Sequence, residues 1–138
     1  MYLLDTNVVS ELRKAKAGKA NRQVVAWAGS VPAGSLYLSA ITVLELEMGV
    51  LQIERRDRAQ GSLMRCWLDE HVMPAFAGRI LAVDAHVALR CARLHVPNRL
   101  AERDALITAT ALVHGMTVVT RNVADFSAAK VPLIDPWC

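Results

Sequence analysis

Short apolar runs alternate with longer helical stretches along the chain, and this alternation restricts the fold more than any other feature. The runs rich in β-favouring residues lie at 2–4, 36–39, 80–83 and 117–120. Residues 131–134 are a candidate fifth strand, at an edge because Pro132 cannot donate to a neighbour. Strands separated by helices pair in parallel and are covered on both faces. The pattern therefore predicts an α/β fold with a central parallel sheet of four to five strands, in a single domain over residues 1–138.

The composition excludes several classes of protein. Hydrophobic residues make up 54% of the chain, which is enough for a full core and argues against disorder. No apolar run approaches the roughly 20 residues that span a bilayer, and the start lacks the basic segment of a signal peptide. The three cysteines are too few and too scattered for a disulfide framework or a zinc knuckle. Unpaired thiols persist in a reducing compartment, so we expect a cytoplasmic protein.

Basic residues give the chain a formal net charge of +3, which is compatible with a polyanionic partner. Twelve of the 16 basic residues are Arg, whose planar guanidinium suits phosphate and carboxylate groups. Residues 13–19 form a basic loop without an apolar anchor. A solvated linker is the simpler interpretation of this loop, and a phosphate-contacting loop beside the site is the alternative.

Carboxylates stand at the ends of the predicted strands. Asp5 directly follows the first strand, and the helix after it is predicted to begin at Val8 with Thr6 or Asn7 as its cap. Glu45 lies near the start of the helix after the second strand, and Asp104 lies in the first turn of the most apolar helix. The carboxyl ends of parallel strands meet at one edge of the sheet, where ligands bind. We therefore expect these acids to gather around Asp5.

Several carboxylates in one crevice repel each other and raise each other's pKa. A divalent cation relieves this repulsion, and an all-oxygen site suits Mg²⁺, with Mn²⁺ as a second possibility. Such an ion can lower the pKa of a bound water and neutralise a leaving oxygen, so hydrolysis of a phosphodiester follows naturally. The four histidines show no ligand spacing, and the chain has neither a Gly-rich phosphate loop nor a nucleophile elbow.

Four segments in this order resemble PIN-domain nucleases, and more narrowly the VapC and FitB type of toxin–antitoxin systems. They are Leu-Leu-Asp-Thr-Asn-Val-Val-Ser-Glu-Leu at 3–12, Leu-Ser-Ala-Ile-Thr-Val-Leu-Glu-Leu at 38–46, Arg-Asp-Ala-Leu-Ile-Thr-Ala-Thr-Ala at 103–111 and Val-Val-Thr-Arg-Asn-Val-Ala-Asp-Phe at 118–126. The resemblance covers essentially the whole chain. It implies a metal-dependent endoribonuclease that acts as a toxin and is blocked by a cognate antitoxin.

The resemblance also implies roles for individual residues. Asp5, Glu45 and Asp104 match the acidic, metal-binding positions of the family. Thr6 and Thr120 match hydroxyl residues that follow the first acid and end the fourth strand.

The fourth acidic position departs from the pattern, because this chain has Asn122 where some relatives have Asp. Asp125 is the nearest acid, and it turns inward if a short helical turn there is anchored by Phe126. A turn-capping role for Asp125 stands as an equal alternative. The choice between Asn122 and Asp125 decides whether a second metal is expected.

Two other classes of function are alternatives to a nuclease. A receiver-type phosphoacceptor domain requires a paired acidic motif after the first strand and a Lys after a later one, and both are missing. A non-catalytic module that keeps the fold to dock an antitoxin or RNA is the remaining alternative. The three acids at 5, 45 and 104 argue against it, and metal-dependent nuclease activity discriminates between the two.

An apolar excess predicts protein partners. Residues 41–76 read as a helical hairpin, and its first helix carries an apolar stripe formed by Ile41, Leu44, Met48 and Leu51. The apolar residues beyond the needs of a small sheet are Trp27, Met48, Leu51, Ile53, Met64 and Trp67. Such surfaces usually mark partners. We expect an antitoxin whose amphipathic helix lies in a groove of the hairpin, and a homodimer.

Overall fold

The computed structural model describes residues 1–138 and contains a five-stranded sheet of order β3-β2-β1-β4-β5. Its strands are β1 (Tyr2–Leu4), β2 (Leu36–Ser39), β3 (Ile80–Leu81), β4 (Thr117–Val119) and β5 (Leu133–Ile134). All neighbouring strands pair in parallel, so the predicted α/β fold and its parallel sheet are confirmed. The sheet places β1 in the middle, and the strand order changes direction there. In open α/β sheets this is the position beside which ligands bind.

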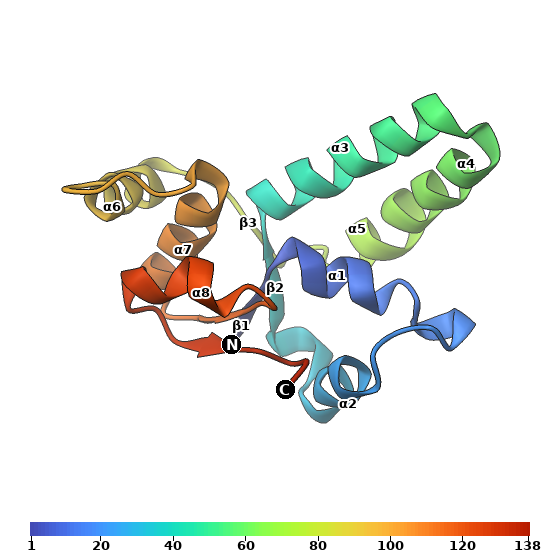
Figure 1. Cartoon of the computed structure of the whole chain (residues 1–138), viewed down its shortest axis with the longest axis horizontal. Coiled ribbons are helices and arrows are strands. Elements are labelled where there is room, and N and C mark those ends of the chain that lie inside the picture. Colours follow the sequence, from blue (N-terminus) through green and yellow to red (C-terminus); the bar gives the residue numbers. More distant parts are fainter.

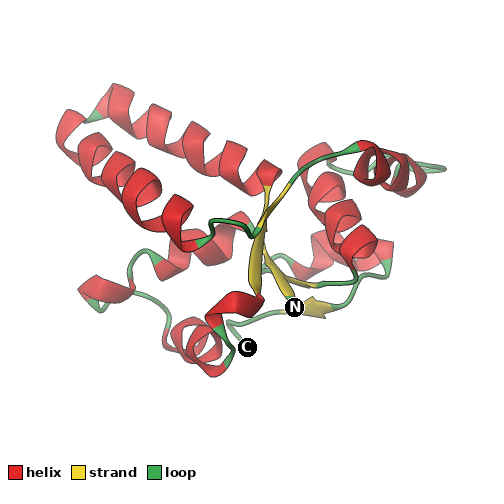
Figure 2. Cartoon of the chain, turned by 180° about the vertical axis from the view of Figure 1, so that it is seen from behind, coloured by secondary structure: helices red, strands yellow, loops and turns green.

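Helices cover both faces of the sheet, as Figure 2 shows with the strands in yellow between red helices. The helices are α1 (Thr6–Leu12), α2 (Arg22–Ser30), α3 (Ala40–Arg56), α4 (Arg58–Trp67), α5 (Met73–Ala75), α6 (Ala85–Leu94), α7 (Glu102–His114) and α8 (Val123–Phe126). A π-helical turn at Leu68–Val72 joins α4 to α5. None of these helices has the length and apolar character needed to cross a membrane.

Helix ends follow local signals in the sequence. Ser39 and Asp84 each accept a hydrogen bond from a backbone N–H in the helix that follows, and these caps start α3 and α6. Gly115 ends α7 in the left-handed conformation, with φ of 65°, which glycine adopts without steric cost. These signals are local, so they could be read correctly before any tertiary contact was known.

The core lies in two main clusters, one on each face of the sheet. Leu3 and Val118 belong to one cluster, while Leu4 and Val119 belong to the other, because successive side chains of a strand point to opposite faces. On the first face Ile107 of α7 and Phe126 of α8 complete the packing. On the second face the contributions come from α1, α2, α3 and the π-helical turn, through Val8, Val9, Val24, Leu46, Val50, Leu68 and Val72. The sheet is therefore held between two apolar layers.

The α3–α4 hairpin projects from the rest of the fold, which Figure 1 shows in cyan and green. On the apolar stripe of α3, Leu44, Met48 and Leu51 are exposed, which agrees with the expected apolar excess at Met48 and Leu51. The same expectation was wrong for Trp27, Met64 and Trp67, because these side chains pack against the core. The face buried instead carries Thr42, Leu46 and Val50. Both sets have helical spacing, and the contact of α3 with α1 and α4 selects the second set. An apolar strip is thus left on the outer surface of α3.

The two helices of the hairpin approach closely and are joined by ion pairs. Arg65 of α4 binds Glu47 of α3 through two contacts of 2.7 Å, and it also binds Glu54 at 3.1 Å. Gly61 of α4 is buried against the backbone of Glu54. The hairpin is therefore a rigid arm, and its α3 helix starts beside the end of β2 and carries Glu45.

Candidate active site

Asp5 is the centre of the site because it follows the central strand. Its backbone N–H donates to the carbonyl of Val119 at 2.9 Å, which continues the pairing of β1 with β4. Its side chain is 5% exposed and accepts hydrogen bonds from the N–H of Thr6 at 2.8 Å and from Oγ1 of Thr120 at 2.8 Å. The helix α1 begins at Thr6 with Asp5 as its cap, so the predicted cap at Thr6 or Asn7 was wrong. The Asp5 carboxylate accepts the hydrogen bond of the first free N–H of the helix, that of Thr6, so neither the Thr6 nor the Asn7 side chain is the cap.

Glu45 approaches Asp5 from α3, one turn into the helix. Oε1 of Glu45 accepts a hydrogen bond from Oγ1 of Thr6 at 2.7 Å, so Thr6 joins the two acids. Nη1 of Arg103 lies 3.5 Å from Oε2 of Glu45 and 3.7 Å from the sulfur of Met48. Glu45 is thus held between a hydroxyl on one side and a guanidinium on the other.

Asp104 enters from the first turn of α7, which packs on the opposite face of the sheet from α1. Its side chain is half-buried and lines the same pocket as Asp5 and Glu45. Burial raises the pKa of Asp104 above its usual value, and the charges of Asp5, Asp125 and Glu45 raise it further. Only Arg103 opposes these effects. Asp104 is therefore an acid held next to other acids with little direct compensation.

The pKa of Asp5 is also raised, first by burial and then, to a smaller extent, by the charges of Glu45 and Asp125. The hydrogen bonds from Thr120 and Thr6 act in the opposite direction, because they stabilise the ionised carboxylate. The residues that act on the Asp5 carboxylate come from positions as far along the chain as 125. The fold thus brings together the three acids expected to gather here, and their mutual repulsion is a property of the folded chain.

Two residues, Asn122 and Asp125, are the candidates for the fourth acidic position. Asn122 lines the pocket, and its backbone N–H donates to Oγ1 of Thr120 at 3.0 Å. Asp125 is exposed and does not line the pocket, yet its charge raises the pKa of Asp5 and of Asp104, so its part in the site stays a prediction. Phe126 anchors the short helix α8 as expected, being 1% exposed. Adjacent residues of a helix point about 100° apart, so burial of Phe126 turns Asp125 toward solvent.

The pocket around these acids has a volume of about 470 Å³, within the range of small-molecule sites. Its acidic lining residues are Asp5, Glu11, Glu45 and Asp104, its basic ones are Arg13, Lys14 and Arg121, and the others are Thr6, Asn7, Ser10, Asn122 and Trp137. The pocket therefore has an acidic centre and a basic rim. Arg13 and Lys14 belong to the 13–19 loop, which is exposed throughout as the solvated interpretation expects, and these two residues also line the pocket.

The sequence matches the PIN domain family over residues 2–131. The chain belongs to the PIN-domain family. It is 39% identical to toxin FitB of Neisseria gonorrhoeae, with 99% of both chains covered. It is 38% identical to the VapC ribonuclease Y4jK of Sinorhizobium fredii, covering 99% of this chain and 98% of that protein.

Solved structures agree with these relatives. The crystal structure of FitAcB from Neisseria gonorrhoeae matches this PIN domain with a TM-score of 0.89 and 39% identity, over 99% of both chains. The structure of FitAB bound to an IR36 DNA fragment matches with a TM-score of 0.90 and 38% identity, covering 100% of this chain and 96% of that one. The DNA-bound VapBC of Salmonella typhimurium, at 20% identity and a TM-score of 0.73 with 99% and 98% coverage, shares the fold. The similarity therefore extends over the full length of the PIN domain.

The donors of this PIN domain fit an oxygen-preferring divalent cation. Asp5, Glu45 and Asp104 offer carboxylate oxygens. Burial, followed by the charges of neighbouring acids, raises the pKa of Asp5 and of Asp104, and a bound cation would favour their ionised forms. In the arrangement described, no three acidic, histidine or cysteine side chains are grouped closely enough to hold an ion. Glu45 is instead bound to Thr6 and Arg103.

Four residues of the site were missed by sequence reasoning. Nδ2 of Asn7 lies 3.4 Å from both Asp5 and Thr120, and its position two residues after Asp5 was the only available signal. Arg103 precedes Asp104 directly, so its sequence position was a second signal. Arg121 and Trp137 lie in the rim because β4 and β5 are neighbours. The guanidinium of Arg121 lies over the ring of Trp137, and nothing in the sequence indicated this contact.

Proposed function

We propose that this PIN domain is a divalent-metal-dependent endoribonuclease and the toxin of a toxin–antitoxin pair. The observation that carries the proposal is the convergence of Asp5, Glu45 and Asp104 on one pocket at the carboxyl end of β1. The full-length relatives support it, because they include proteins named as a toxin and as a ribonuclease. The basic rim supports a polyanionic substrate.

Asp5, Glu45 and Asp104 would hold the cation, for which Mg²⁺ is the best match and Mn²⁺ the second. When bound, such an ion supplies a nucleophilic water and neutralises charge on the phosphate. Thr120 and Thr6 orient the Asp5 carboxylate through the 2.8 Å hydrogen bonds to its two oxygens. Oriented ligands of this kind are typical of metal sites, in which outer contacts fix the inner ones.

The partner in this proposal is an antitoxin protein. A neighbour from Klebsiella pneumoniae at 25% identity is a toxin–antitoxin complex, and the FitAB and VapBC structures that share the fold are bound to DNA. The exposed strip of Leu44, Met48 and Leu51 on α3 offers an apolar surface for such a partner or for a second copy of the chain. We place the protein in the cytoplasm, where its three free cysteines stay reduced.

A non-catalytic binding module remains the second candidate, favoured by the same exposed strip on α3. Cleavage of single-stranded RNA with and without Mg²⁺ separates the two. Asp5→Asn keeps the shape of the side chain and removes its charge, so we expect activity to fall by about 10²-fold or more.

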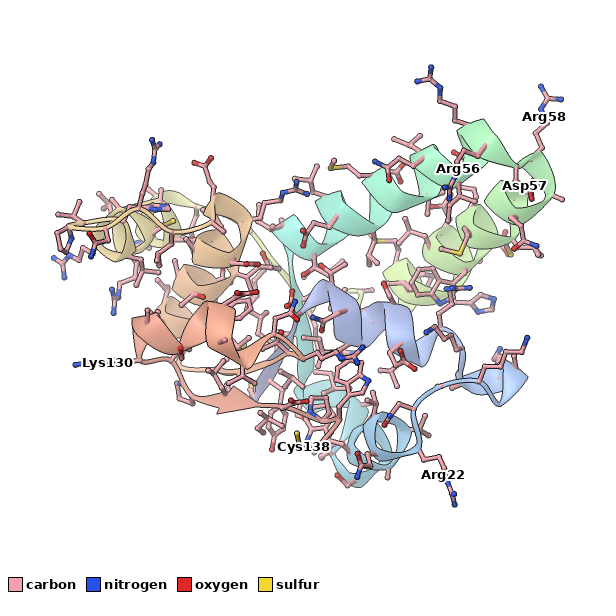
Figure 3. All side chains as sticks on the ribbon, in the orientation of Figure 1. Arg22, Arg56, Asp57, Arg58, Lys130 and Cys138 are labelled. Carbon is pink, nitrogen blue, oxygen red and sulfur yellow. The ribbon has the colours of Figure 1, made fainter.

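The matched control is Asp57→Asn. Asp57 caps α4 at the tip of the hairpin, where Figure 3 labels it, and it does not line the acidic pocket. Asn caps helices as well as Asp does, so this variant should cleave like the wild type. If Asp5→Asn cleaves RNA as the wild type does in Mg²⁺, the metal-binding role of Asp5 is wrong. If the wild type binds RNA and never cleaves it, the binding-module candidate is preferred.

A further inference from the structure

The rim of the acidic pocket contains one aromatic side chain among twelve lining residues, and that residue is Trp137. Trp137 is anchored, since its backbone N–H donates to Asp135 at 2.9 Å and its ring packs against the core. The guanidinium of Arg121 lies over this ring, 5.3 Å from its centroid. An arginine stacked on a fixed aromatic face loses little further freedom when it binds a ligand.

Arg121 makes no direct polar contact through its side chain within the chain, although its charge helps to lower the pKa of Glu11. Its side chain makes no ion pair within 4 Å and donates no hydrogen bond, although it is exposed. Arg79, which lies over Phe76 in a similar way, gives its donors to the carbonyls of Leu36 and Ala75. The stack of Arg79 therefore serves the fold, whereas the donors of Arg121 are left for a ligand at the pocket.

The other bases of the rim are either paired or lie on another side of the pocket. Lys14 is paired with Glu11 at 3.1 Å, and Glu11 also accepts from the N–H of Asn21 at 2.8 Å. Arg13 lies over Trp67 at 5.9 Å, on the hairpin side of the pocket. Arg121 instead lies directly after β4, one residue beyond Thr120, whose hydroxyl contacts Asp5. It is the uncommitted charge nearest in the chain to the centre of the site.

We propose that Arg121, held against the indole of Trp137, binds a backbone phosphate of single-stranded RNA next to the phosphate that is cleaved. The inference rests on the proposed function, because it assigns the substrate of the same pocket. The stacked guanidinium keeps its N–H edge free, and that edge matches two phosphate oxygens. Trp137 is a positioning residue in this arrangement, since it acts through Arg121.

The test measures binding of fluorescein-labelled single-stranded RNA in EDTA, at several salt concentrations, so that affinity is separated from cleavage. Arg121→Ala should weaken binding about tenfold, the effect of one charge-assisted contact. The slope of log affinity against log salt should fall by about 0.7, the value for one phosphate on a single strand. In Mg²⁺ the same variant should raise KM and leave kcat nearly unchanged.

Conservative variants distinguish the stack from the charge. Arg121→Lys should keep the salt slope and lose part of the affinity, because a Lys lacks the planar fork. Trp137→Phe should bind nearly as well as the wild type, while Trp137→Ala should weaken binding with the salt slope kept. Arg58→Ala removes the same charge at the tip of the hairpin, away from the pocket (Figure 3), and should bind like the wild type.

The inference is overturned if Arg121→Ala binds RNA with the same affinity and the same salt slope as the wild type. It is also overturned if the wild type binds RNA too weakly to measure. Equal affinities of Trp137→Ala and the wild type would remove Trp137 from the arrangement and overturn the stacked geometry. Loss of the Arg121 effect leaves cleavage by the wild type intact, so the proposed function survives that result. Absence of cleavage in Mg²⁺, with the Arg121 effect present, rejects the nuclease and keeps the RNA contact.

Discussion

Replacing Gly61 with alanine would place a methyl group inside the backbone of the neighbouring helix. A Cβ atom at this position would lie 2.5 Å from Cα and 2.9 Å from the backbone nitrogen of Glu54. Carbon atoms in contact normally stand about 3.5–4.0 Å apart, so α3 and α4 must separate by roughly 1 Å. That separation also pulls Arg65 away from Glu54, which it contacts at 3.1 Å.

Two opposing effects set the change in folding stability caused by Gly61→Ala. Overpacking of this kind costs about 1–3 kcal/mol. Alanine is favoured over glycine within a helix by about 1 kcal/mol. Gly49→Ala is the matched control, because Gly49 also lies inside a hairpin helix and a Cβ there would meet nothing within 4 Å. Gly49→Ala should gain the propensity alone, so the two variants should differ in stability by about 1–3 kcal/mol.

Urea unfolding followed by circular dichroism measures this difference directly. Equal m-values in the two variants would show that their denatured states are comparable, so that the change in midpoint reports stability. Gly61→Ala should unfold at a lower urea concentration than the wild type, and Gly49→Ala at a higher one. Two variants that agree within about 0.5 kcal/mol would refute the close approach of α3 and α4.

Further predictions concern the rim of the pocket. Asp125→Asn should weaken Mg²⁺ binding by less than about tenfold, and only at low salt, because an exposed charge outside the pocket acts at long range and is screened. Asn122→Ala should leave the Mg²⁺ affinity unchanged, and calorimetric titration with Mg²⁺ measures both variants. A larger loss of affinity in Asn122→Ala than in Asp125→Asn would make Asn122 the ligand-orienting residue. Glu11 has its pKa lowered by hydrogen bonds from Asn21 and Lys14, so it stabilises the fold above the unfolded pKa and loses this effect as the pH falls through the lowered value. Glu11→Gln should therefore unfold at lower urea than the wild type at pH 7, and the difference should vanish in acid; a constant difference across pH would contradict this role.

Much of the fold could be predicted because its signals are local. Leu36–Ser39 is a strand with the predicted bounds, and the caps at Ser39 and Asp84 start helices where a short polar side chain meets an apolar run. The position of Asp5 at the end of a central strand followed from the alternation of strands and helices. Its gathering with Glu45 and Asp104 followed from the same topology.

The remaining features depend on contacts between segments far apart in the sequence. Helix α3 carries apolar residues on more than one face, so periodicity alone could not decide between Leu44 and Leu46 as the inward residue. The contact of Arg103 with Glu45 depends on how α7 sits beside α3. The stack of Arg121 on Trp137 depends on the pairing of β4 with β5. Side-chain partners of this kind are decided by packing, which the sequence pattern does not contain.

The hydrogen bond between Thr120 and Asp5 joins residues that are 115 positions apart in the chain. During synthesis Asp5 leaves the ribosome first, yet its oxygens have neither their Thr120 donor nor the support of β4 until almost the whole chain has emerged. Loop closure over such a distance comes late in folding. A nascent or prematurely terminated chain therefore lacks an assembled site, and nonsense codons anywhere before position 120 should be equally disabling.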